Sequence, residues 1–154
     1  MLSRPTTEQI LHDCRAELLD KIAPAVAPGA AQIAIDMLDN VLRNCAMRAA
    51  HEIAWMREEG GAMVAFAMRV AASSSTTPEV SDALRTYDAA DTESLHLDDV
   101  VHAYGLAGAC FGAALDAAMA SGDEVLTRDA RALLEERLAH ENEIMGEWAM
   151  VGRA

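Results

Sequence analysis

Apolar residues recur every three or four positions along most of the chain, which is the spacing of one face of an α-helix. The clearest stripe lies between residues 30 and 59 and contains Ile33, Met37, Leu38, Val41, Cys45, Ala49, Ile53 and Met56. No segment shows the strict alternation of apolar and polar residues that is typical of a strand. The pattern therefore predicts an all-α protein.

Start and stop signals divide this pattern into about five to six helices. Thr6 and Gln9 have the spacing of a capping box, and Pro24 ends the helix that follows. The pair Gly60–Gly61 is expected to break or kink the next helix, and Thr77 with Pro78 opens a short one. We expect long helices at about residues 30–59, 97–120 and 123–149. A length of 154 residues predicts one helical-bundle domain spanning 1–154.

Composition supports helices and excludes two classes of partner. Hydrophobic residues make up 52% of the chain but aromatic residues only 4%, as expected for a core built from alanine, leucine, methionine and valine. The net charge is −13 and Lys21 is the only lysine. Nucleic acids and anionic membrane surfaces both attract clusters of basic residues, so neither is an expected partner.

The three cysteines are far apart and form no CxxC motif. Cys14, Cys45 and Cys110 each lie in an apolar helical pattern, so we expect buried free thiols, as in a reducing cytoplasm. No secretory signal peptide and no run of about 18 apolar residues is apparent, so a cytoplasmic location without a membrane span is expected.

The pentapeptide R-x-A-H-E occurs twice, at residues 48–52 and 137–141. On a helical wheel its arginine and glutamate fall at or inside the apolar face in both copies. Buried charges need partners, so we expect Arg48, Glu52, Arg137 and Glu141 to form one internal network. His51 and His140 fall at its margins, and Trp55 and Trp148 could wall a pocket beside it.

From the chemistry of these residues we expect neither a metal ion nor a cofactor. Neighbouring helix residues diverge by about 100°, so His51 and Glu52 cannot easily bind one ion, and the arginine beside each glutamate repels a cation. The sequence has no nucleophile elbow, P-loop or dinucleotide-binding glycine pattern. The six polar residues could still supply anion-binding and acid–base groups around an internal pocket.

Three glycines mark the helix expected at 97–120. Gly105, Gly108 and Gly112 lie on one broad side, and each lowers helix stability by about 1 kcal/mol relative to alanine. They indicate close packing of another helix, a seam between copies of the chain, or room for a ligand.

Two segments resemble a known family. "RPTTEQILHDCRAELLDKIAPAV" with "LDNVL", and the tail "SGDEVLTRDARALLEERLAHENE", are similar to small helical bacterial proteins of unknown function. The matching positions include Arg4, Pro5, Thr6, Pro24, Asn40 and Leu42; the Asn-Pro that usually ends the family's last helix is missing. Members are often encoded beside aminoglycoside-phosphotransferase-like kinases and acyl-CoA dehydrogenases. The resemblance implies an accessory protein and assigns no catalytic residue.

Two functions are therefore expected. The first is a non-catalytic cytoplasmic bundle that forms homo-oligomers or serves as an accessory subunit to a partner enzyme, including a phosphotransferase-like kinase. The alternative is a ligand-binding or catalytic bundle that uses the internal arginine, histidine and glutamate residues.

Overall fold

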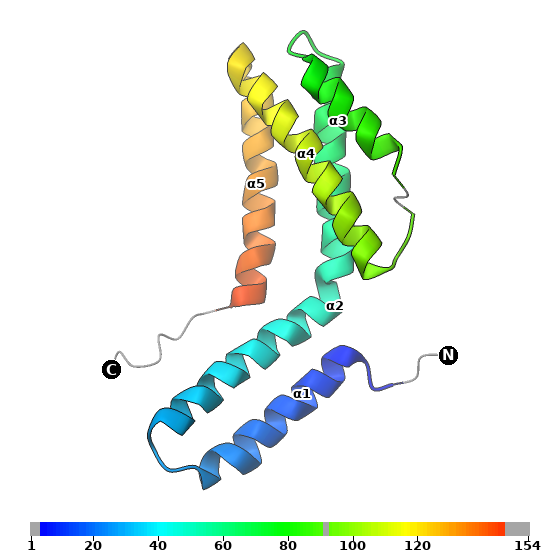
Figure 1. The fold of residues 1–154 in the computed structure, drawn as a ribbon. Coiled ribbons are helices and arrows are strands. Elements are labelled where there is room, and N and C mark those ends of the chain that lie inside the picture. Colours follow the sequence, from blue (N-terminus) through cyan, green and yellow to red (C-terminus); the bar gives the residue numbers. More distant parts are fainter. Residues whose placement is uncertain (1–3, 91–92, 147–154) are drawn as a thin grey trace. The chain divides into compact units, whose positions relative to one another are not determined.

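The computed structural model describes residues 4–90 and 93–146, which form helices and no strand (Figure 1). The all-α prediction is thus confirmed for the described residues. The helices are α1 (Thr7–Glu17), continued by a π-helical turn (Leu18–Ile22) and a 3₁₀ turn (Ala23–Ala25), then α2 (Ala30–Ala71), α3 (Pro78–Asp88), α4 (Leu97–Ser121) and α5 (Glu124–Met145). Residues 147–149 of the last predicted helix lie outside the described residues.

The chain groups into two compact units, each described here by itself. The first comprises residues 1–52 and 141–154, and we call it the hairpin unit. The second comprises residues 53–140, and we call it the bundle unit. Helix α2 contributes to both. The single-domain organisation expected from the length stays a prediction.

The helix ends follow from local hydrogen bonds that the sequence anticipates. The capping box before α1 is present: the Thr6 hydroxyl accepts from the backbone N–H of Gln9 at 3.2 Å, and the Gln9 side chain accepts from the N–H of Thr6 at 2.9 Å. At the C-terminal end of α4, Gly122 adopts a left-handed φ of 71° that ends the helix. The carboxylate of Asp123 then accepts from the first free N–H groups of α5.

The expected break at Gly60–Gly61 is wrong, because α2 continues without interruption to Ala71. Gly60 is buried, and a β-carbon there would lie 3.6 Å from the β-carbon of Ala107. Packing against α4 therefore offsets the low helix propensity of this residue, which a prediction from local signals alone does not include.

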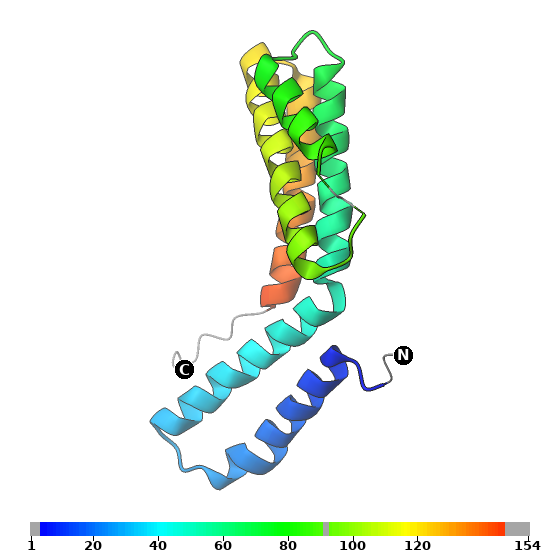
Figure 2. The same cartoon turned by 45° about the vertical axis from the view of Figure 1, so that its right-hand side comes forward.

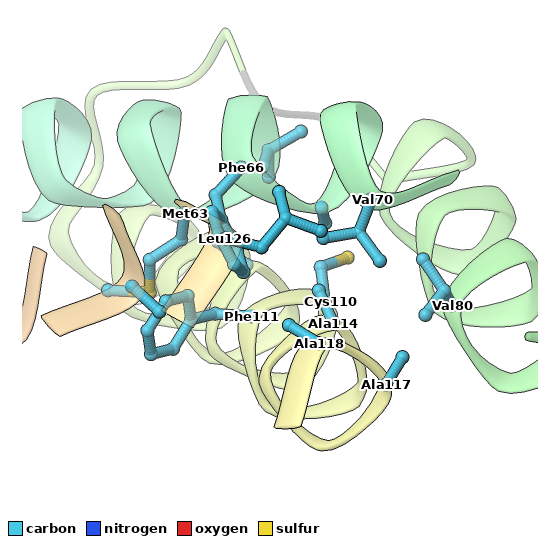
Figure 3. Packing of buried hydrophobic residues seen from close by; sticks show 14 residues of the cluster. Met63, Phe66, Val70, Val80, Cys110, Phe111, Ala114, Ala117, Ala118 and Leu126 are labelled. Atoms are coloured by element: carbon cyan, nitrogen blue, oxygen red, sulfur yellow. The ribbon is translucent and has the colours of Figure 1, made fainter. Parts of the chain in front are cut away.

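The core of the bundle unit is made by the later part of α2 together with α3, α4 and α5, which lie side by side in Figure 2. Phe66 and Phe111 contact each other with ring centroids 5.5 Å apart, and small residues of α4 let the helices approach (Figure 3). The fully or nearly fully buried residues include Met63, Phe66, Val70, Val80, Cys110, Phe111, Ala114, Ala118, Leu126 and Ala130.

The hairpin unit pairs α1 with the first part of α2, which run side by side in both views (Figures 1 and 2). Arg15 donates to both carboxylate oxygens of Asp39, at 2.7 and 3.1 Å, and this hydrogen bonding raises the pKa of the guanidinium. Among the described residues of this unit, the buried hydrophobic ones are Leu18, Ile35 and Ala46. The unit therefore has a clamp between its helices but very little core.

Candidate functional site

The core stripes of three helices each continue into polar residues at the same end of the bundle unit. On α2 the stripe Val70, Phe66, Met63 continues to Glu59, and on α4 the stripe Ala114, Phe111, Ala107 continues to Tyr104. On α5 the stripe Leu126, Ala130, Leu133 continues to Arg137 and His140. Helical spacing thus carries four polar side chains to one place, which we call the Glu59 cluster (Glu59, Tyr104, Arg137 and His140).

Glu59 is the centre of this cluster, with a side chain only 10% exposed. The Tyr104 hydroxyl donates to Oε2 at 2.5 Å, and Nδ1 of His140 lies 2.7 Å from Oε1. Nε of Arg137 lies 3.4 Å from Oε2 and donates to the Tyr104 oxygen at 3.0 Å. Both carboxylate oxygens therefore have hydrogen-bond partners, which is what a carboxylate in a poorly hydrated position requires.

Two aromatic contacts hold the donors in place. The imidazole of His140 stacks on Trp55 with ring centroids 4.6 Å apart and an interplanar angle of 5°. The guanidinium of Arg137 lies over the Tyr104 ring, 5.7 Å from its centroid. Burial and the hydrogen bond to Glu59 raise the pKa of Tyr104 to about 12, so its hydroxyl remains a donor over the whole neutral range.

Of the residues expected to form an internal network, the structure brings Arg137 and His140 together within the bundle unit. They meet around Glu59, which the pentapeptide does not contain. Arg48 and Glu141 are exposed and Glu52 is half-buried; no ion pair joins these three within the described residues. Half-buried His51 lines an open surface hollow with residues 4–8. Trp148 lies outside the described residues.

A signal for Glu59 was present in the sequence. It stands between Met56 and Met63 at helical spacing, so it lies on an apolar face. The preceding Glu58 and the following glycine pair make the same stretch resemble the polar end of a helix, and this masks the signal.

The bundle unit also has a shallow cleft of about 200 Å³ beside the cluster. The ring of Tyr104 forms part of its wall, and Gly61, where a β-carbon would meet no atom within 4 Å, leaves space along α2. The donors of the cluster are bound to Glu59 or to one another, so the arrangement holds a carboxylate in place. Among the described residues, no group of three histidine, cysteine or acidic side chains could hold a metal ion.

The hairpin unit presents a different feature, a large apolar surface. Seven large hydrophobic side chains are between 40% and 61% exposed on α1, its following turn and the first part of α2: Ile10, Leu19, Ile22, Ile33, Met37, Leu38 and Val41. Isolated exposed hydrophobic residues are normal, but a contiguous group on one small unit marks an interaction surface.

An apolar groove of about 450 Å³ runs along this surface between the two helices. Its walls come from Ile10, Cys14, Leu18, Ile22, Leu38 and Leu42, with the carboxylates of Asp13 and Glu17 at its edge. Ile33, Met37 and Val41 are spaced one helical turn apart on α2 and form the row of side chains next to Leu38 and Leu42. We call the groove and this adjoining ridge (Ile33, Met37, Val41) the hairpin face.

The hairpin face corrects two sequence expectations. The predicted core stripe of the second helix begins with Ile33, Met37 and Leu38, yet these residues are exposed, and it is Ile35 and Ala46 that are buried. Cys14 and Cys45 are also exposed, so only Cys110 fits the expectation of a buried thiol. Periodicity correctly identifies an apolar face, but it does not say whether the other helices of the same unit cover that face.

The glycines of α4 do not serve close packing within the described chain. A β-carbon at Gly105, Gly108 or Gly112 would meet no neighbouring atom within 4 Å. A seam between copies at this place, or a ligand, stays a prediction.

Helix α4 is the one described helix that is long and apolar enough to cross a membrane, with a mean hydropathy of 1.3 over its best window. Seven of its residues are buried in the bundle unit, including Cys110 and Phe111. A core helix meets the same length and composition criteria, so this feature does not indicate a membrane span.

Comparisons with protein-family models, curated proteins and solved structures give no match to this chain. The resemblance to small helical bacterial proteins stays an expectation.

Proposed function

We propose that this chain acts without chemistry of its own, by binding another protein chain through the hairpin face. The observation that carries the proposal is the imbalance of the hairpin unit: seven large hydrophobic side chains are at least 40% exposed, while three hydrophobic residues are buried. Two amphipathic helices alone cannot enclose an apolar face, so such a unit is normally completed by further helices.

The energy available from burying the hairpin face is comparable in size to the cost of association. Full burial of a large apolar side chain is worth about 1.5–3 kcal/mol, so covering the exposed half of seven such side chains is worth roughly 5–10 kcal/mol. Association loses about 4–15 kcal/mol of translational and rotational freedom. The hairpin face is therefore large enough to contribute most of an interface, whereas an isolated exposed leucine would not be.

The bound chain belongs to one of two classes, a further copy of this protein or an enzyme that it assists. The resemblance noted in the sequence suggests a phosphotransferase-like kinase for the second class. Both classes require an apolar surface that recognises protein, and neither requires the Glu59 cluster to react.

Capture of bound chains in the native host tests this proposal. The tagged full-length protein is compared with Met37→Glu and with Met119→Glu as a matched control, because these methionines are 61% and 63% exposed on different helices. We expect the original protein and Met119→Glu to retain the same chains, and Met37→Glu to lose them. Equal retention by all three proteins contradicts the proposal.

Ligand binding is a second candidate function, favoured by the cleft beside Tyr104. A hydroxyl fixed by Glu59 and Arg137 gives this cleft a rigid aromatic wall. Filling the space with Gly61→Leu is expected to abolish binding of any small molecule retained by the purified protein. If the Gly61→Leu variant retains the same molecule in the same amount, the cleft is not its binding site.

A further inference from the structure

We infer that the chain occupying the hairpin face is a second copy of this protein, the two hairpins together forming a four-helix bundle. This inference rests on the proposed function and names its partner. The argument uses the charge, the shape and the composition of the hairpin unit.

The charge of the hairpin helices differs from that of the remaining chain. Residues 4–48 contain six acidic and five basic side chains, a net charge of −1, whereas the whole hairpin unit carries −4 and the whole chain −13. Two copies of so acidic a protein repel one another wherever their acidic surfaces meet. The near-neutral hairpin is the part of the molecule that a second copy can approach with little repulsion. A strongly basic partner would find little complementary charge there.

Three of the basic side chains on the hairpin have partners within the hairpin unit. Arg15 is bound by Asp39 at 2.7 Å, and Lys21 lies 3.4 Å from Glu17 on the same helix. Arg43 donates to the backbone carbonyl of Met145 at 2.5 Å, at the end of α5. These arginines and this lysine are therefore already occupied, and the surface offered to a partner is mainly apolar.

The hairpin face combines a groove with a neighbouring ridge of exposed apolar side chains. Ile33, Met37 and Val41 are spaced four residues apart and form a ridge on α2, beside the groove lined by Ile10 and Leu38. A two-fold axis through the face places the ridge of each copy over the groove of the other, so one patch supplies both halves of the contact. Antiparallel hairpins packed in this way give the arrangement of a four-helix bundle, in which the apolar faces point inward.

Sedimentation of the purified full-length protein tests this inference over a wide dilution series. We expect a concentration-dependent transition from 16.5 kDa to twice that mass for the original chain and for Met119→Glu. Met37→Glu should shift the midpoint to at least a tenfold higher concentration. Circular dichroism of each variant establishes that the helices remain, and Met37→Leu should dimerise like the original chain.

The outcomes separate the inference from the proposal on which it rests. A mass of 16.5 kDa at every concentration overturns the inference that the partner is a second copy. The proposed function would still be supported if Met37→Glu selectively lost the host chains captured by the original protein. Dimers that Met119→Glu disrupts and Met37→Glu does not would place the contact on the glycine side of α4 and overturn the inference. Loss of dimers in Met37→Glu alone supports it.

Discussion

The hydroxyl of Tyr104 donates to Oε2 of Glu59 at 2.5 Å, joining α4 to α2 at the point where the core of the bundle unit ends. Arg137 and His140 bring α5 to the same carboxylate. One acidic side chain thus holds three helices together through directional contacts. The apolar core supplies burial, and the Glu59 cluster fixes how the helices are aligned at its end.

Replacing Glu59 with glutamine should destabilise the bundle unit much more than the same replacement at its exposed neighbour Glu58 does. The amide offers one acceptor oxygen in place of two, and its N–H₂ group faces donors that bind Glu59 in the original protein. Arg137 also loses its ionic partner. We expect the free energy of unfolding to fall by about 2–3 kcal/mol. Urea denaturation measures this change. The control is Glu58→Gln at the exposed neighbouring position, where a change within about 0.5 kcal/mol is expected. Equal effects would show that Glu59 is not a specific contact.

The titration of Tyr104 gives a second prediction. In Tyr87→Phe it is the only remaining tyrosine, so the absorbance of tyrosinate should report a pKa of about 12 in place of 10.0. Because the folded value is the higher one, the folded protein holds this proton more tightly than the unfolded chain does. The contribution of Tyr104 to stability should therefore be constant below about pH 10 and should be lost as the pH rises to about 12. A midpoint near 10 would mean that the Tyr104 hydroxyl is neither buried nor bound to Glu59.

The aromatic pair in the core predicts a strong effect of truncation. Phe66 is 1% exposed and contacts Phe111, so Phe66→Ala should reduce the free energy of unfolding by about 3–5 kcal/mol. Met68→Ala is a suitable control two residues away, since Met68 is 50% exposed and should change stability by less than about 1 kcal/mol. Thermal or urea unfolding of both variants distinguishes them. Similar losses would contradict the packing shown in Figure 3.

Salt dependence follows from the charge distribution. Two chains of −13 repel through their acidic surfaces, while the hairpin face between them is nearly neutral. Screening should therefore strengthen association of the copies as ionic strength rises, because repulsion weakens and apolar burial does not. Sedimentation at low and high salt measures this. Weaker association at high salt would indicate that opposite charges, and not apolar contacts, hold the copies together.

The sequence predicted elements better than it predicted partners. Thr6 with Gln9 and Thr77 with Pro78 mark real helix starts, because capping and proline effects act over a few residues. Gly60–Gly61 misled the prediction, since the contact of Gly60 with Ala107 joins residues 47 positions apart. Only tertiary packing makes that pair compatible with a continuous helix.

The same limit explains the candidate sites. Arg137 was identified because it interrupts an apolar stripe on α5, and His140 because it belongs to the same pentapeptide; the structure places both at the cluster. Arg48 and Glu52 interrupt a similar stripe on α2, but the apolar residues of that stripe are largely exposed. A charged residue on an apolar face needs an internal partner only when its own chain covers the face.

The thiol of Cys14 offers the most direct measurement of whether the hairpin face is covered, because this exposed cysteine lines the groove. Its alkylation rate is followed by peptide mass spectrometry across a dilution series of the full-length protein. We expect the rate to fall as concentration rises through the dimer transition, and to stay constant in Met37→Glu. An alkylation rate at Cys14 that is equally fast at all concentrations would contradict the account.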